Sequence, residues 1–422
     1  MSRAPQLPLP TFRPLAIART AAVLVLFIPT IAGCPAPATD NNGGNNNGGN
    51  NNGGNNGGGT VTEGTYLVLG YNEFGMHCMN QDFSEFMILP PYNNLRAQVI
   101  NRQGEDPRIA TTGVTISYTV PGNTHSADKT NFWTYAKALL NVTLQPNVGL
   151  AGNGLSGTMA ITGENDWVAT GIPITPIMDS GQENTYPLGT ISVTVGGTTV
   201  AQTQAVVPVS WEINCDLCHS TPGISVATDI LRKHDQRHGT TLENSKPVFC
   251  AGCHADAALS AAGQPGRETL SRAMHGSHAS RMSAVNLAVA CYACHPGIRT
   301  QCLRDVHFSA SMTCTDCHTS MEAVADPSRQ PWVDEPRCGS CHSRSGSQYE
   351  QAGTLFRHSK GHGNVHCAAC HGAPHAITPT VDAADNVQAL ALQGHTGVLN
   401  TCTVCHTQQP DDAFFHHLGG GD

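Results

Sequence analysis

Residues 215–219 read CDLCH, and this pattern of two cysteines, two intervening residues and a histidine recurs six more times. The other copies are CAGCH at 250–254, CYACH at 291–295, CTDCH at 314–318, CGSCH at 338–342, CAACH at 367–371 and CTVCH at 402–406. All seven lie in the second half of the 422 residues. Any fold for this half of the chain must therefore accommodate seven equivalent sites.

Each motif has the spacing that attaches one haem c. Two thiols separated by two residues add to the two vinyl groups of a haem, and the following histidine binds its iron. A single Cys-x-x-Cys pair could instead belong to a zinc site, a redox dithiol or a disulfide. Seven pairs, each followed by a histidine, do not suit zinc. Every zinc ion needs four ligands, which two pairs would supply, and seven pairs cannot be divided in this way. The sequence therefore predicts seven haem c groups.

The residues of these predicted sites fall into two sets. The thioether cysteines are Cys215, Cys218, Cys250, Cys253, Cys291, Cys294, Cys314, Cys317, Cys338, Cys341, Cys367, Cys370, Cys402 and Cys405. The proximal ligands of the iron are His219, His254, His295, His318, His342, His371 and His406.

At these motifs the chain resembles the multihaem c-type cytochromes, over about residues 211–417. The resemblance implies closely packed haems that pass electrons from one to the next. With about 30 residues for each haem, residues 211–422 cannot build a large side-chain core, so the haems must supply much of the apolar interior. We expect a domain of helices and loops, with helices within 228–238, 266–279 and 381–395 and few strands.

A low-spin haem needs a second axial ligand, and histidine is abundant enough to provide it. Of the 21 histidines, twelve lie after Cys215 and outside the motifs. The preferred distal ligands are His234, His275, His307, His362, His375, His395 and one of His278, His358 or His416. Four of the twelve form two pairs, each on one helix face: His234 with His238, and His275 with His278. One member of each pair is expected to bind iron.

The first 59 residues predict export and a lipid anchor. Residues 1–33 combine three arginines with an apolar run too short to span a membrane, which is typical of a signal peptide. The run ends in Ile31-Ala32-Gly33-Cys34, which resembles the bacterial lipobox and implies acylation of Cys34. Pro35 follows, and by the rule for such lipoproteins this indicates the outer membrane. The Asn- and Gly-rich residues 34–59 predict a flexible tether.

Residues 60–210 have a globular composition without haem motifs. Short runs rich in valine, threonine, isoleucine and tyrosine are separated by turn-forming residues. They read TYLVLGY, LRAQVI, GVTISYTV, LNVTL, GTMAIT, WVATGIPI, TISVTV and TVAQTQAVVPVS. About 150 residues of such strands predict an all-β domain, an antiparallel sandwich of the immunoglobulin-like kind.

Cys78 and Cys302 are the only cysteines outside the lipobox and the motifs. In an exported protein they could form a disulfide between the two regions, and two separately buried thiols are the alternative. Cys78 lies between His77 and Met79, and these three are the residue types of blue-copper ligands. Three adjacent residues cannot easily face one ion, so we do not expect copper here.

The chain is acidic, with a formal net charge of −9, and loss of the three signal-peptide arginines would make it more negative. This excludes nucleic acid as an expected partner and favours redox proteins, other cytochromes or an oxidised metal.

Three functions fit the motifs. The first is electron transfer, as an outer-membrane lipoprotein, between a periplasmic or outer-membrane partner and an extracellular acceptor such as a metal oxide. The second is a multihaem reductase that acts on a small substrate at one haem without a distal ligand. The third is a subunit of a cytochrome filament. The sequence leaves open whether the protein is an enzyme, and it favours the electron carrier because no motif is altered.

Overall fold

The computed structural model describes residues 64–104, 106–342, 349–411 and 416. These residues belong to one compact unit. The predicted signal peptide, the acylation site at Cys34 and the whole predicted tether lie outside the described residues. Among the described helices, none is long and apolar enough to cross a membrane.

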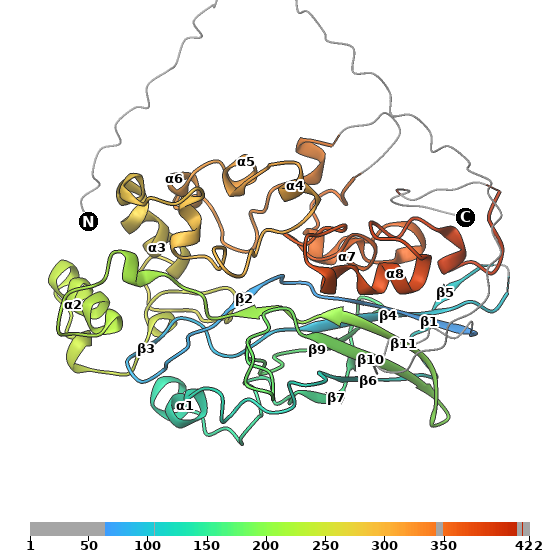
Figure 1. Cartoon of the computed structure of the whole chain (residues 1–422), viewed down its shortest axis with the longest axis horizontal. Coiled ribbons are helices and arrows are strands. Elements are labelled where there is room, and N and C mark those ends of the chain that lie inside the picture. The colour runs from blue at the N-terminus through green and yellow to red at the C-terminus, as the bar shows by residue number, and fades with distance from the viewer. Residues whose placement is uncertain (1–63, 105, 343–348, 412–415, 417–422) are drawn as a thin grey trace, which may run out of the picture. The chain divides into compact units, whose positions relative to one another are not determined.

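The first region is built from antiparallel β-strands in two main sheets (Figure 1). The first sheet has the order β1 (Tyr66–Tyr71), β4 (Leu95–Asn101), β9 (Trp167–Ala169) and β8 (Ala160–Ile161), with β5 (Arg108–Ile109) also paired to β4. The second sheet has the order β11 (Thr198–Val206), β10 (Leu188–Val195), β6 (Thr115–Thr119) and β7 (Ser156–Thr158). The expected run of short strands is thus confirmed for most of this region.

The two sheets share one hydrophobic core. Val68 and Leu95 from the first sheet and Ile116 and Ile191 from the second belong to the same buried cluster. Along β10, buried and half-buried side chains alternate, as the two-residue period of a strand requires. Close approach of the sheets explains Gly70, because a Cβ atom there would lie 2.7 Å from Cδ1 of Ile191.

One strand expected in this region is wrong. The run LNVTL, residues 140–144, is not a strand: its first residue ends helix α1 (Phe132–Leu140), and the others form a loop. Phe132, Ala136 and Leu139 are buried at helical spacing and direct one face of α1 into the core. The helix ends at Asn141, whose φ of 56° is the left-handed conformation that asparagine tolerates at a C-terminus.

The second region consists of short helices, single turns and loops, as the sequence predicts. The α-helices are α2 (Val226–His238), α3 (Leu270–His278), α4 (Val306–Ser309), α5 (Cys314–His318), α6 (Met321–Val324), α7 (Cys367–His371) and α8 (Val387–Gln393). The 3-10 turns are η1 (Cys215–Leu217), η2 (Leu242–Asn244), η3 (Cys250–Gly252), η4 (Ala279–Ala284), η5 (Ala290–Ala293), η6 (Cys338–Ser340), η7 (Phe356–His358), η8 (His362–Asn364), η9 (Ala383–Asn386) and η10 (Cys402–Val404). Helices α3 and α8 fall within the segments expected to be helical, and α2 covers its expected segment 228–238 but begins two residues earlier, at Val226.

Two short parallel strand pairs lie near the start of the second region, and the second of them joins the two regions. β2 (His77–Cys78) pairs with β12 (Val209–Ser210), just before the first motif, and β3 (Phe86–Met87) pairs with β13 (Val248–Phe249), just before the second. Near the other end of the chain, α7 contacts β1 and α8 contacts β11. In Figure 1, α7 and α8 accordingly run beside the sheets. Three segments of the second region, β13, α7 and α8, are thus fixed to the first.

A buried arginine also joins the regions. The Arg304 side chain is 1% exposed, and its guanidinium donates to both carboxylate oxygens of Asp385. It also donates to the carbonyl of Cys302 and lies 4.4 Å from the ring centroid of Tyr186 in the first region. Burial opposes charge on Arg304, but the Asp385 carboxylate outweighs it and raises the arginine pKa, so the guanidinium stays charged at neutral pH.

We predict that Arg304→Met lowers the free energy of unfolding by about 3–5 kcal/mol, because it leaves the Asp385 carboxylate buried without its charged partner and with only the Thr380 hydroxyl as a donor. Arg299→Met is the control, since the Arg299 and Glu183 side chains of its ion pair are 57% and 34% exposed. The control should cost less than about 1 kcal/mol. Guanidinium unfolding followed by far-ultraviolet circular dichroism measures both variants, and equal losses would contradict the assigned role of Arg304.

Candidate haem-binding sites

Every motif folds as one tight helical turn. In the first, the amide of His219 donates to the carbonyl of Cys215 at 2.9 Å, and equivalent bonds of 2.9–3.0 Å close four others. The remaining two motifs are the short helices α5 and α7. Residues three and four positions apart lie on one face of such a turn. The spacing therefore places both thiols and the imidazole of each motif on the same side of the backbone.

Two buried motif thiols, Cys250 and Cys370, are poorly suited to act as a redox dithiol or as zinc ligands, whereas a hydrogen bond with Cys314 lowers the pKa of Cys291 to about 6. Burial raises the pKa of Cys250 and of Cys370 to about 12, so both thiols stay protonated at neutral pH. The thiolate is the form that attacks disulfides and binds metal ions. Within the described ranges, no three His, Cys, Asp or Glu side chains gather as a metal site requires.

Each motif histidine faces one histidine from outside the motifs. The ring centroids lie 6.4 Å apart for His219 and His278, 6.4 Å for His254 and His234, 6.0 Å for His295 and His275, 6.2 Å for His318 and His375, 6.1 Å for His342 and His307, 5.8 Å for His371 and His416, and 6.0 Å for His406 and His362. No histidine appears in two of these pairs. The structure thus matches seven motif histidines with seven different partners.

These separations fit an iron ion between two imidazoles. A metal–imidazole bond is about 2 Å long and the ring centre lies roughly 1 Å beyond the nitrogen, so two such rings across one ion are about 6 Å apart. Stacking of the rings on each other does not account for this distance, because the angle between the two ring planes ranges from 12° to 81° among the pairs. The donor set of each pair and its neighbouring cysteines therefore fits a covalently attached, six-coordinate haem.

The hydrogen bonds of the ring nitrogens agree with this geometry. His254 Nδ1 lies 2.9 Å from the carbonyl of Glu268, and His275 Nδ1 lies 2.7 Å from that of Ser271. His278 uses Nδ1 in the same way, 2.7 Å from the carbonyl of Met274. A carbonyl at Nδ1 fixes the proton there and leaves Nε2 unprotonated, which is the arrangement that metal-binding histidines use.

An aspartate takes the place of the carbonyl at one other site, and a second aspartate lies near His219 Nδ1 without a hydrogen bond to it. His307 Nδ1 lies 3.0 Å from a carboxylate oxygen of Asp305, whose other oxygen accepts the first amides of α4. His219 Nδ1 lies 3.5 Å from a carboxylate oxygen of Asp229 on α2. Sequence reasoning did not identify either aspartate. The position of Asp305, two residues before His307, was the one signal available for them.

Burial keeps several of these rings neutral. The pKa values of His295, His371 and His375 are all lowered to about 4, chiefly by burial and then by neighbouring histidines. A neutral imidazole is the form that binds metal. His375 pairs with His318 of the fourth motif rather than with His371, which lies four residues before it.

The structure does not bring all distal candidates to a motif. His395 pairs with no motif histidine among the described residues, and its Nδ1 faces the carbonyl of Thr396 at 2.9 Å. His358 is likewise absent from the seven pairs. On α3 both His275 and His278 face motif histidines, whereas on α2 His234 does and its neighbour His238 does not. Where one ligand was expected from each helix, α3 thus offers two.

The residues around Cys78 do not converge on one point. His77 Nε2 lies 2.7 Å from the carbonyl of Pro90, and Met79 is fully buried in the sheet core. Cys78 and Cys302 are both free thiols, with no disulfide between them. Burial raises the pKa values of Cys78 and Cys302 to about 12 and about 11. Among the charges acting on Cys78 is that of Cys302, so the two thiols lie near each other.

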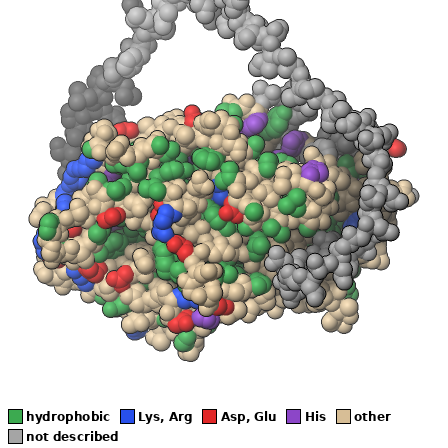
Figure 2. Space-filling view, viewed as in Figure 1, with side chains coloured by type: hydrophobic (Ala, Val, Ile, Leu, Met, Phe, Trp, Pro, Cys, Tyr) green, Lys and Arg blue, Asp and Glu red, His purple; other side chains and the backbone are tan. Residues whose placement is uncertain are grey.

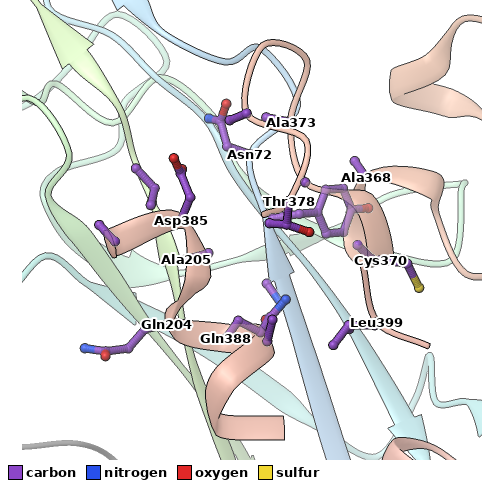
Figure 3. A pocket seen from close by; sticks show the side chains of 18 of the residues that line it. Asn72, Gln204, Ala205, Ala368, Cys370, Ala373, Thr378, Asp385, Gln388 and Leu399 are labelled. Atoms are coloured by element: carbon purple, nitrogen blue, oxygen red, sulfur yellow. The ribbon is translucent and has the colours of Figure 1, made fainter. Parts of the chain in front are cut away.

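A pocket opens where the sixth motif meets the sheets (Figure 3). Its wall includes Cys370 from α7, Gln388 from α8 and Ala205 from β11. The Gln388 side-chain oxygen accepts from the Gly70 amide at 2.7 Å and from the Thr203 hydroxyl at 3.0 Å. These bonds satisfy a backbone amide of β1 and a side-chain hydroxyl of β11, and they fix α8 beside the sixth motif.

Comparison with protein families, with curated proteins and with solved structures finds no significant match for this chain. The arguments that follow therefore rest on the geometry of the motifs and their histidine partners.

His77 predicts a dependence of stability on pH. Burial lowers its pKa in the folded protein from 6.5 to about 4, so the unfolded chain binds a proton at higher pH than the folded one. The folded state should lose stability as pH falls from about 7 towards 4. In His77→Gln this contribution is absent, so the difference between the unfolding midpoints of wild type and variant should narrow between pH 7 and pH 5. A constant difference would contradict the assignment.

Proposed function

We propose that this protein is an electron carrier with seven covalently attached haem c groups, each bound by two histidines. The observation that carries the proposal is the matching of seven motif histidines to seven separate partners at 5.8–6.4 Å. In each site the two cysteines would hold the porphyrin and the two imidazoles would bind its iron. Haem iron supplies a reversible one-electron change.

The composition of the buried interior supports the same proposal. In the first region, large aliphatic and aromatic side chains fill the space between the sheets. After residue 211, the buried apolar side chains of the described residues are mostly alanines, and the larger exceptions are Leu231, Leu270 and Val404. So little side-chain volume cannot hold seven motifs together by the hydrophobic effect alone. Seven porphyrins would supply the missing apolar surface.

We also assign a finer architecture to the two regions. The shared core of the two antiparallel sheets favours a sandwich of the immunoglobulin-like kind for the first. The second is assigned as a haem-packed cytochrome domain. The parallel strand pairs before the first and second motifs support a scaffolding role for the sandwich.

Electron transfer is favoured over catalysis at an open haem. A reductase of this type keeps one iron position free for substrate, which requires a motif histidine without a facing imidazole. All seven motif histidines have such a partner among the described residues.

The proposed location is the outer membrane, through acylated Cys34 and the following tether, and the proposed partners are other redox proteins or an extracellular metal oxide. Cys34 lies outside the described residues, so this part rests on the sequence. On the face in Figure 2, acidic and basic side chains are interspersed, and several histidines reach the surface near one edge. This mixture offers no broad basic surface for nucleic acid.

The first test is spectroscopy of the mature protein. We expect a haem-to-protein ratio of seven by haemochrome assay, low-spin ferric signals in the electron paramagnetic resonance (EPR) spectrum, and no change on adding carbon monoxide to the reduced protein. The physical reason is that two strong-field imidazoles fill both axial positions of each iron. A high-spin fraction near one haem in seven that binds carbon monoxide would contradict the carrier function and identify an open site.

The second test separates a paired histidine from an unpaired one. His375→Ala should convert one haem in seven to the high-spin form, because it removes the ring that faces His318. His395→Ala is the matched control and should leave all haems low-spin. Optical spectra in the high-spin charge-transfer region measure both. A high-spin signal in the control, or none in His375→Ala, would overturn the pairing.

A further inference from the structure

The motifs are numbered here as sites 1 to 7 in chain order, so that site 1 contains His219 and site 7 contains His406. Neighbouring sites can be identified from shared helices, hydrogen bonds and aromatic contacts. The inference rests on the proposed function, because it concerns the order of the haems that these sites would hold.

Site 1 lies directly beside site 3. Helix α3 provides the partner of His295 through His275 and the partner of His219 through His278, three residues later. The side-chain amide of Asn214, which precedes the first motif, donates to the carbonyl of Tyr292 inside the third at 3.0 Å. Two independent contacts therefore join motifs that are separated in the sequence by site 2.

Site 2 is held on the far side of site 1 by helix α2. This helix provides His234 as the partner of His254, and five residues earlier it places Asp229 beside His219. Helix α3 also begins near site 2, where the carbonyl of Glu268 lies 2.9 Å from His254 Nδ1. The ligand for site 3 is seven residues beyond Glu268, which precedes the helix, whereas on α2 Asp229 and His234 are five residues, or about 7 Å, apart. Site 1 is thus the nearer neighbour of site 2.

Sites 3, 4 and 5 follow in chain order. Helix α3 packs against α6, which comes directly after the fourth motif, and a Cβ atom at Gly276 would lie 3.6 Å from that of Ala325. The partner of the fourth motif, His375, accepts at its carbonyl from the amide of Arg304 at 3.0 Å. Three residues later, His307 faces the fifth motif.

Sites 5, 6 and 7 complete the series. The ring of Tyr349 lies 5.8 Å from that of His342 at site 5 and 5.3 Å from that of His416 at site 6. The carbonyl of Cys370 at site 6 accepts from the amide of Leu399, three residues before site 7 begins, at 3.1 Å. An aromatic side chain thus connects sites 5 and 6, and the backbone connects sites 6 and 7.

We propose that the seven sites form one unbranched series in the order 2–1–3–4–5–6–7, with sites 2 and 7 as its two ends. The order differs from the sequence at one place, where the first two sites are exchanged. Electrons would then enter and leave next to the CAGCH and CTVCH motifs, so partner proteins or acceptors should dock at these two ends.

A pair of matched variants tests the exchange. Neighbouring oxidised haems couple magnetically and broaden each other's EPR signals. In Cys215→Ala/Cys218→Ala, which removes haem 1, we expect one haem of the remaining six to give a sharp, isolated low-spin signal, because haem 2 has lost its neighbour. In Cys250→Ala/Cys253→Ala, which removes an end haem, no isolated signal should appear. The reverse result is expected if the sites follow sequence order.

The haem-to-protein ratio separates this test from that of the proposed function. Six haems in each variant and the wrong EPR pattern would overturn the order alone, whereas a wild type without covalent haem would overturn the function. If the cysteine variants fail to mature, His278→Met keeps haem 1 but raises its reduction potential. At a potential where haem 1 alone is reduced and therefore diamagnetic, the isolated signal of haem 2 should appear. Its absence would overturn the order, and His234→Met is the control.

Discussion

The structure depends on the distance of about 6 Å between two imidazole rings that would share one iron. A motif turn can position its own histidine locally, because the cysteines and histidine lie three and four residues apart. The facing histidine comes from another segment, and its ring must reach the same point within a fraction of an ångström. Seven such requirements fix the relative positions of short helices that bury few apolar side chains of their own. The fold of the second region is therefore set by its sites.

The first region supplies the rigidity that the second lacks. Its sheets enclose a conventional core, and the motifs at both ends of the proposed series attach to it. The second motif follows β13, which pairs with β3, while Arg102 at the end of β4 donates to the backbone carbonyls of Thr403, Cys405 and His406 in the seventh. The sixth motif also packs against the first region, because α7 contacts β1. A sheet scaffold that holds the two ends constrains the distance over which the remaining haems must extend.

Sequence reasoning identified the motif residues and most helices and strands, because these depend on local spacing. It could not choose the distal ligands, since His275 and His278 lie on one helix face just as His234 and His238 do, and only the placement of neighbouring motifs distinguishes them. The loop after α1 shows the same limit for secondary structure. LNVTL has strand-forming residues, but the preceding segment buries Phe132 and Leu139 at helical spacing, and that burial decides the conformation.

The exchange of sites 1 and 2 has a physical cause in the way the chain crosses between regions. β12 pairs with β2 before the first motif, β13 pairs with β3 before the second, and α2 lies between β12 and β13 in the chain. The chain therefore passes site 1, turns back along α2 to reach site 2 at the edge, and must cross site 1 again to continue. Helix α3 makes this crossing, which explains why it carries histidines for both sites 1 and 3. A helix with ligands for two sites fixes their separation by its own geometry, so the close approach of these haems would not depend on flexible loops.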